Sequence, residues 1–453
     1  MRKILSICAV AVMMTACEKK LDLKPYSSIE REQALLTEED VRVTLIGVYD
    51  GIQRATLYGG DIMVINELLG NRENILFTGT YPGLADIHAL EITTQNSFGT
   101  DTWNAAYNTI NRANYVLSAL DKVTSSETER NRIEGEALFL RASLFFELVK
   151  LYAKPYGDGD NSTNPGIPLA LTPTDFITEE SFVSRNSVAE VYAKIVEDLT
   201  AAEAKISANG LTSKASVAAM LSRVALMQGN YEMARDAANR VLSSYSQGRS
   251  LAFEFSNLWY TYALRGGNVP SEYIFTMLVT QQDGTNSLNT YFGTGTSLNG
   301  TGGRSDCKIL PAHIAKYEPG DVRGSFFVQS GNSFYTQKHL DIYGHVPIIR
   351  LAEIYLTRAE ANFRLGTSVG ADPLDDVNTI RERAGLDPLA VVTLDDILKE
   401  RYLELAFEGQ GLSDAKRTRS NWSGTAWNSS KLILPIPQRE IDVNPNLVQN
   451  EGY

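Results

Sequence analysis

The stretch from Glu134 to Tyr152 constrains the fold of this chain most strongly, because it has helical spacing and apolar residues on most of its sides. Its central stripe recurs every fourth residue, at Leu140, Leu144, Leu148 and Tyr152, and is widened by Ala137, Phe139, Phe145, Phe146, Val149 and Leu151. A helix this apolar cannot lie on a surface, so other helices must enclose it. Pro155 and Gly157 end it, because proline cannot continue a helix and glycine frees the turn. The sequence therefore predicts a mainly α-helical protein built around this segment.

The composition is that of an ordinary globular protein. The chain has 453 residues, of which 43% are hydrophobic and 21% are charged, both within the usual range. Its formal net charge of -12 argues against a nucleic-acid-binding protein, which needs a basic face to release counterions. Of the three cysteines, Cys8 and Cys17 belong to an N-terminal segment with a separate role. Cys307 is therefore expected to be a small apolar residue without an intrachain disulfide.

The first residues have the pattern of an export signal. Arg2 and Lys3 supply positive charge, and Ile4 to Met14 is an apolar run that is long enough for a signal sequence but too short to span a bilayer. Small residues then precede Cys17, as in a bacterial lipobox, although a methionine stands where leucine is usual. No other run in the sequence is long and apolar enough to be a membrane span.

We therefore predict a lipoprotein signal peptide over residues 1–16 and lipidation of Cys17 as the first residue of the mature protein. Each buried lipid methylene is worth about 0.8 kcal/mol, so several acyl chains would anchor the protein durably. The alternative is ordinary signal cleavage that leaves Cys17 as a free thiol. Residues 17–28 are polar with one proline and are expected to form an extended tether.

Further helices are predicted from capping signals and apolar spacing. Capping boxes begin at Thr37 and Ser187, and Thr393 begins a last long helix. Two segments resemble tetratricopeptide helix pairs, in which small residues lie where the helices cross and a glycine forms the turn. These pairs are Lys214–Gln228 with Tyr231–Leu242, and Leu351–Leu365 with Asp375–Ala384. Plain helix packing is the alternative explanation of their spacing.

Between these helices the pattern is irregular. Residues 58–98 are punctuated by glycines, and residues 251–343 are rich in Gly, Ser, Thr, Asn and aromatic residues, with a predicted hairpin at 326–336. Long irregular segments inside a domain are more often functional than accidental. We predict one domain over residues 29–453. It comprises a helical core at about 38–245 and 346–410, a loop-rich insertion at about 251–343, and an extended tail at 432–453.

The motifs of common enzymes are missing from the sequence. It contains no G-x-S-x-G, H-E-x-x-H, P-loop or dinucleotide fingerprint. The four histidines, His88, His313, His339 and His345, lack the tight spacing of a metal site, so no metal or cofactor is predicted. Carboxylates are numerous, but glycoside hydrolysis depends on their separation, which the sequence does not give. We therefore regard a hydrolase as a minor alternative.

Aromatic residues in the irregular segments are the most suggestive feature. Aromatic rings bind the apolar faces of sugars, and Asn, Arg, Asp and Glu bind sugar hydroxyls. The aromatic residues concerned are Tyr81 and Phe98, Trp259, Tyr260 and Tyr262, and Tyr291 and Phe292. For each of them taken singly, core packing or scattered exposure is the more common explanation.

Several stretches, in chain order, resemble the SusD/RagB family of surface nutrient-capture lipoproteins of Bacteroidetes. They are Asp101-x-Trp103-x-x-x-Tyr107-x-x-Ile110-x-x-x-Asn114, Ala137-x-Phe139-Leu140-Arg141-Ala142, Ile167-Pro168-Leu169, Arg350 to Leu356, Ala359-Glu360-Ala361, Ile380-Arg381-x-Arg383-Ala384-Gly385, Glu400-Arg401 and Glu404 to Gly409. The most specific piece is the end of the chain, Leu434-Pro435-Ile436-Pro437-Gln438-x-Glu440-Ile441 followed by Asn444-Pro445-Asn446-Leu447-x-Gln449-Asn450-x-Gly452-Tyr453. After Gly409-Gln410 the family usually has arginine and an aromatic pair, whereas this chain has Gly411-Leu412-Ser413. That departure leaves the packing of this turn open.

The resemblance implies a non-catalytic protein that is lipid-anchored in the outer membrane and faces the cell exterior. It also implies an oligosaccharide ligand, and a SusC-type TonB-dependent transporter as the partner to which the ligand is delivered. The alternatives are a RagB-like protein that captures peptides and, less favoured, a glycoside hydrolase. Ligand residues of the family lie in variable loops, so the candidates follow from position and chemistry alone. They are Glu67, Arg72, Asn74, Tyr81, Trp259, Tyr260 and Tyr291.

Overall fold

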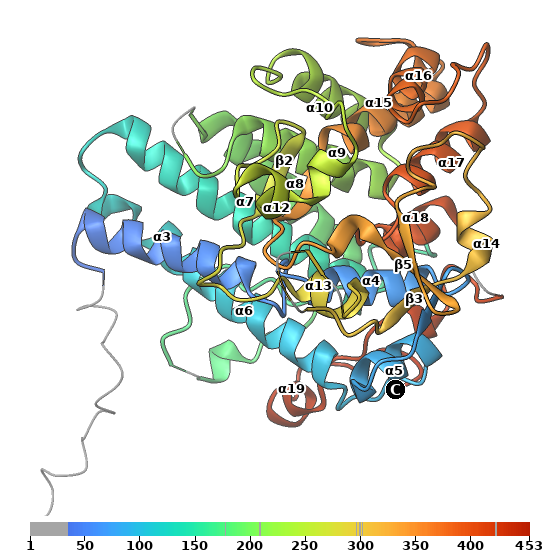
Figure 1. Ribbon diagram of the computed structural model, residues 1–453. Coiled ribbons are helices and arrows are strands. Elements are labelled where there is room, and N and C mark those ends of the chain that lie inside the picture. Colours follow the sequence, from blue (N-terminus) through green and yellow to red (C-terminus); the bar gives the residue numbers. More distant parts are fainter. Residues whose placement is uncertain are drawn as a thin grey trace, which may run out of the picture.

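The computed structural model describes residues 35–176, 178–207, 210–295, 297–298, 300, 302–421 and 424–453 (Figure 1). The predicted signal peptide and Cys17 lie outside these residues. The protein is mainly helical, as predicted. No helix in the described part is long and apolar enough to cross a membrane.

The predicted central helix is α7 (Glu127–Tyr152). It packs against α3 (Glu38–Gln53), α6 (Ser97–Ser118), α8 (Val188–Lys205) and α9 (Lys214–Gln228), and every residue from Gly135 to Tyr152 is buried. The helix begins earlier than its apolar pattern indicates, because the Ser126 hydroxyl accepts a hydrogen bond from the Glu129 amide and caps a polar first turn. Its charged residues are also enclosed. The Arg141 guanidinium bonds Asp198 at 2.9 Å, and Lys150 pairs with Glu147 at 2.7 Å.

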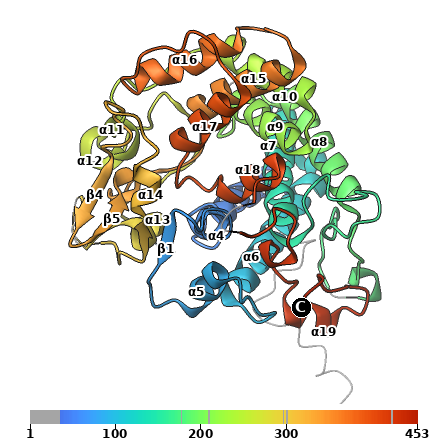
Figure 2. The same ribbon diagram turned by 90° about the vertical axis from the view of Figure 1, so that its right-hand side faces the viewer.

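The two tetratricopeptide-like pairs lie side by side. The first is α9 with α10 (Tyr231–Ser243), and the second is α15 (Leu351–Leu365) with α16 (Pro373–Arg383). Gly229 and Gly366 end α9 and α15 in the left-handed conformation, at φ +70° and +64°, which glycine adopts at little cost. Helix α10 packs against α15, so α8, α9, α10, α15 and α16 follow one another in an arc (Figure 2). The next helix, α17 (Leu394–Glu404), covers α15.

The capping signals are confirmed at all three helix starts. At Thr37, Ser187 and Thr393 the hydroxyl accepts from the backbone amide three residues on, and the acidic side chain there accepts from the cap residue's own amide. Each box satisfies two amides that would otherwise lack partners at a helix start. These local signals explain why the helix starts at Glu38, Val188 and Leu394 agree with the sequence.

Two small antiparallel sheets join the irregular segments. The larger has the order β1 (Ile75–Phe77), β3 (Cys307–Ile309), β5 (Ser333–Thr336) and β4 (Phe327–Ser330). Strands β4 and β5 form the predicted hairpin, and Ile75 pairs with Ile309. The smaller sheet pairs β2 (Tyr273–Met277) with β6 (Val346–Arg350). The larger sheet therefore binds the two irregular segments to each other.

The prediction of an irregular segment over residues 58–98 was wrong in part. Helix α4 (Asp61–Gly70) occupies its first half, and all ten of its residues are buried. A helix that is covered on every side has no polar face, so the alternation that reveals surface helices is absent. Helix α5 (Pro82–Ala89) follows β1. Residues 66–81 of this irregular segment are thus helix to Gly70, a turn, strand β1 and a short connection.

The loop-rich insertion also contains short elements, namely α11 (Ser256–Trp259), α12 (Thr261–Arg265), α13 (Ser287–Phe292), α14 (Pro311–Ile314) and the 3-10 turn η3 (Gln337–His339). Outside it the short elements are α18 (Gly411–Thr418), α19 (Gln438–Val443) in the tail, and the 3-10 turns η1 (Leu120–Lys122), η2 (Glu179–Ser181) and η4 (Ser430–Leu432). Apart from α19 the tail is largely extended. It is tied to the core where the Leu434 amide donates to the carbonyl of Leu151, near the end of α7.

Candidate ligand-binding site

Three aromatic rings from distant parts of the chain meet at one place. Tyr81 precedes α5, Phe98 lies in the first turn of α6, and Tyr291 lies in α13. The ring centre of Tyr291 is 5.7 Å from that of Tyr81 and 6.4 Å from that of Phe98, and Tyr81 and Phe98 are 5.9 Å apart. All three contacts are edge-to-face, the arrangement that aromatic rings favour. Tyr81 and Phe98 are half-buried, so part of the cluster reaches the surface.

A buried carboxyl group lies against this cluster. Asp61, the first residue of α4, accepts a hydrogen bond of 2.9 Å from the Tyr291 hydroxyl. Burial raises the pKa of Asp61 from 3.8 to about 7, and the nearby charge of Asp101 raises it further, while the bond from Tyr291 opposes the shift. An acidic group with so few partners can exchange hydrogen bonds with sugar hydroxyls.

An exposed arginine covers one ring of the cluster. The guanidinium carbon of Arg304 lies 4.6 Å from the centre of the Tyr81 ring. The same side chain donates to Asp306 at 3.1 Å and to the Thr80 hydroxyl at 2.5 Å. Burial raises the pKa of Asp306, and Arg304 opposes that shift. We call Asp61, Tyr81, Phe98, Tyr291 and Arg304 together the Tyr81 cluster. It offers apolar ring surface, a hydrogen-bond acceptor and a cationic donor within one small area.

The predicted residues of the first irregular segment have mostly structural contacts. Glu67 is buried, and one of its carboxylate oxygens accepts the amides of residues 409, 410 and 411 at 2.8, 3.1 and 3.3 Å. Asn74 is buried and donates to the Asn71 side chain. Arg72 is half-buried and donates to the carbonyl of His88 at 2.7 Å. These three residues hold the segment to its neighbours and are not members of the Tyr81 cluster.

Two further predicted residues lie elsewhere. Trp259 is only 3% exposed, and its ring lies 4.8 Å from the Lys338 ammonium group and 5.4 Å from the Arg350 guanidinium. Tyr260 stacks on Phe326 and donates to Gln337 at 3.0 Å. They belong to a separate packed group, so of the seven predicted residues only Tyr81 and Tyr291 come together.

The sequence reasoning missed Asp61 and Arg304. Asp61 is 230 residues from Tyr291, and it opens a helix whose pattern gave no signal. Arg304 directly follows Gly302 and Gly303 in the irregular segment that is rich in glycine and aromatic residues. A cationic side chain in that segment was the sequence signal that could have marked Arg304 as a candidate binding residue.

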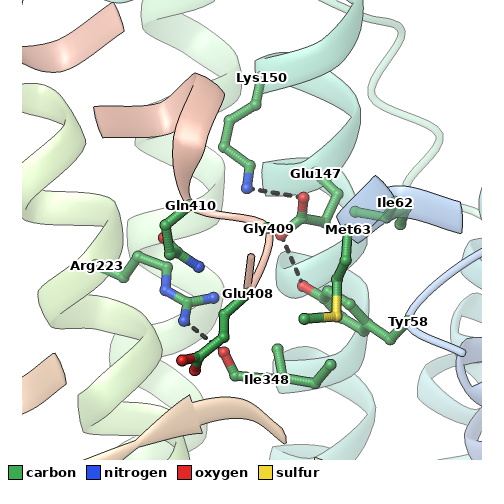
Figure 3. Close-up of a pocket in the computed structure, with 10 residues that line it drawn as sticks. All are labelled: Tyr58, Ile62, Met63, Glu147, Lys150, Arg223, Ile348, Glu408, Gly409 and Gln410. Atoms are coloured by element: carbon green, nitrogen blue, oxygen red, sulfur yellow. Dashed lines mark hydrogen bonds and ion pairs between the residues drawn. The ribbon is translucent and has the colours of Figure 1, made fainter. Parts of the chain in front are cut away.

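Two cavities of the described structure are too small for a sugar. One holds about 10 Å³, roughly what a single water needs. Figure 3 shows its polar lining, in which Lys150 pairs with Glu147 and the Tyr58 hydroxyl donates to the same carboxylate at 3.0 Å. A second holds about 20 Å³ beside Glu67 and Arg401. No group of three or more His, Cys, Asp or Glu side chains among the described residues is placed to hold a metal ion.

A stacked helical scaffold with an aromatic cluster that partly reaches the surface defines a class of binding proteins, and comparison with known proteins identifies it. A family model described as "Starch-binding associating with outer membrane" matches residues 19–226, and a model of the SusD family matches residues 326–424. The chain therefore belongs to the SusD/RagB family, as the sequence motifs indicated.

Individual relatives agree with this assignment. SusD-like protein P38 of Formosa agariphila is 24% identical over 515 aligned positions, which cover 97% of this chain and 96% of the relative. The starch-binding protein SusD of Bacteroides thetaiotaomicron is 37% identical over 122 positions, 24% of this chain and 21% of that protein. The crystal structure of a putative sugar binding protein from Bacteroides vulgatus is 26% identical, with a TM-score of 0.79, and covers 93% of this chain and 99% of that one.

Proposed function

We propose that this protein is a non-catalytic, lipid-anchored glycan-binding protein of the outer membrane. It captures oligosaccharide at the Tyr81 cluster and delivers it to a SusC-type TonB-dependent transporter. The observation that carries the proposal is the meeting of the half-buried Tyr81 and Phe98 and the exposed Arg304 with the buried Tyr291 and Asp61 on a SusD/RagB scaffold. The names of two relatives, a starch-binding protein and a putative sugar binding protein, support a saccharide as the ligand.

The chemistry of the cluster suits binding of uncharged sugars. Half-buried rings can cover the apolar face of a pyranose, while Asp61 and Arg304 exchange hydrogen bonds with hydroxyl groups. The charge of Arg304 is partly balanced by Asp306 at 3.1 Å, so the cluster lacks the surplus of cations that a sulfated or uronic-acid chain would favour. Neutral glycans are therefore the proposed substrate class.

The test is a binding screen of the purified mature protein against glycan and peptide libraries, followed by Tyr81→Ala. We expect the variant to lose at least about tenfold in glycan affinity, or about 1.4 kcal/mol. Phe253→Ala is the matched control, because this aromatic side chain is 92% exposed and lies outside the cluster. Unchanged glycan affinity in Tyr81→Ala would remove the cluster from the proposal.

The same screen separates the alternatives. Selective retention of peptides would favour a RagB-like peptide-capturing protein. Release of shorter sugars from a bound glycan, abolished by Asp61→Asn, would show hydrolysis and overturn the non-catalytic assignment. Trp259→Ala is a poor probe of binding, because removal of a buried ring destabilises the core whatever the ligand.

A further inference from the structure

A second aromatic side chain lies among polar groups away from the Tyr81 cluster. The guanidinium carbon of Arg419 is 5.2 Å from the centre of the Trp427 ring. Trp427 is half-buried and Arg419 is exposed. Arg419 ends α18 in the left-handed conformation, at φ +57°, which is uncommon for a residue other than glycine. The chain thus holds a cation over an indole ring at the surface.

The neighbouring turn supplies hydrogen-bonding groups. Arg419 donates to the carbonyl of Gly157 at 3.2 Å, and the exposed Asn428 donates to the Asp158 carboxylate at 2.9 Å. The turn itself is ordered, because the Gly157 amide donates to the Asn161 side chain at 2.8 Å. A β-carbon built on Gly159 would meet nothing within 4 Å. Ring, cation, amide and carboxylate are therefore held near one another, with Arg419 and Asn428 exposed and Trp427 and Asp158 half-buried.

This group and the Tyr81 cluster lie at the same end of the core. The turn follows the end of α7, where the Tyr152 hydroxyl donates to the carbonyl of Gly99, the residue after Phe98. The chain that follows Trp427 returns to the same place, since the Leu434 amide bonds the carbonyl of Leu151. In both views α5 and α19 lie at the lower end of the molecule, apart from each other (Figures 1 and 2).

We propose that Trp427, Arg419, Asp158 and Asn428 form a second saccharide-binding subsite, which engages the distal units of a long oligosaccharide held at the Tyr81 cluster. The proposal rests on the proposed glycan-binding function and extends it to chain length. The subsite carries one carboxylate and one guanidinium, so it too is suited to neutral sugars. Two such subsites favour long chains, because the second contact forms within an already bound complex and adds avidity without a second encounter.

The experiment compares a disaccharide with a heptasaccharide by calorimetry. The linkage is the one that wild type binds best among malto-, laminari- and xylo-oligosaccharides. We expect Trp427→Ala to weaken heptasaccharide binding about tenfold and leave disaccharide binding unchanged. Tyr81→Ala should weaken both, and Phe253→Ala neither. Asn428→Ala, made at an exposed position that folding tolerates, should weaken heptasaccharide binding several-fold.

The outcomes are distinct. If Tyr81→Ala weakens binding but Trp427→Ala and Asn428→Ala leave heptasaccharide affinity at the wild-type value, the second subsite does not exist. Equal losses for both sugars in folded Trp427→Ala would also overturn it, because a distal subsite cannot affect a disaccharide held at the Tyr81 cluster. If wild type binds none of the three glycan series, the proposed function itself fails. Rescue of heptasaccharide binding by Trp427→Phe would confirm that an aromatic face is required.

Discussion

Replacing the buried acid of the Tyr81 cluster should change how stability depends on pH. Burial raises the pKa of Asp61 to about 7 in the folded protein, against an ordinary value of 3.8. The folded protein therefore keeps a proton that the unfolded chain releases. The stability associated with this proton is fully present below about pH 4 and is lost as the pH rises through 7. Asp61→Asn removes the titration and, with it, this loss.

The size of the effect follows from the two pKa values. Between about pH 5 and about pH 8, ionisation lowers the free energy of the unfolded carboxyl by about 4 kcal/mol, at about 1.4 kcal/mol per pH unit. In the folded protein, ionisation lowers the free energy of the same carboxyl by only about 1.4 kcal/mol over this interval, because the group ionises near pH 7. The free energy of unfolding of Asp61→Asn should therefore rise relative to wild type by roughly 2.6 kcal/mol across this interval.

The assay is urea unfolding of wild type and Asp61→Asn at several pH values. The two proteins share all other titrating groups, so the contributions of those groups cancel in the difference between the two free energies of unfolding. Asp395→Asn, made at an exposed carboxylate of α17, controls for the loss of one surface charge. Tyr291→Phe removes the hydroxyl that bonds Asp61 at 2.9 Å and should steepen the loss of stability, because it takes away the bond that favours ionisation. A difference between Asp61→Asn and wild type that is the same at every pH would refute the reasoning.

Four further predictions concern the scaffold and the proposed lipid anchor. Arg141→Ala should lower the free energy of unfolding by about 3–5 kcal/mol, because it leaves the buried Asp198 without its bidentate partner, and denaturant titration measures this. Gly70→Ala should destabilise by at least about 1–3 kcal/mol, since its β-carbon would fall 2.1 Å from the backbone of α18. Gly47→Ala, with nothing within 4 Å in the middle of α3, should instead stabilise by about 0.5–1 kcal/mol. Cys17→Ala should abolish palmitate labelling and release the protein from the outer-membrane fraction.

Helices with one buried face could be predicted from the sequence because their signals are local. The capping boxes at Thr37, Ser187 and Thr393, and the glycine after α9, lie within a few residues of the structure that they specify. Helix α4 was missed because its apolar run covers only ten residues next to Gly59 and Gly60, and over so short a run periodicity does not separate a buried helix from a buried strand. The equally enclosed helix α7 could be recognised because it is 26 residues long.

The candidate site was harder to predict because it depends on contacts between distant segments. Tyr81 and Tyr291 could be named for their chemistry, but their meeting depends on α13 packing against α4, which no short pattern records. The pairing of Ile75 with Ile309 in the larger sheet brings the same two regions together. Trp259 has the same chemistry as the residues of the cluster, yet it is buried. Residue type thus indicates what a side chain can bind, while tertiary packing decides whether a ligand can reach it.

The role of Glu67 is explained by the turn at Gly409-Gln410-Gly411, where this chain departs from the family pattern. Its carboxylate accepts the amides of residues 409–411 and so satisfies the start of α18, where amides lack intrahelical partners. A β-carbon on Gly411 would lie 3.2 Å from this carboxylate, so glycine permits the close approach that a larger residue would oppose. Glu67 and Gly70 thereby fix one end of α4 against α18, while the other end of the same rigid helix carries Asp61 to the aromatic rings. A residue first predicted to be a ligand contact therefore acts by positioning Asp61, a member of the proposed site.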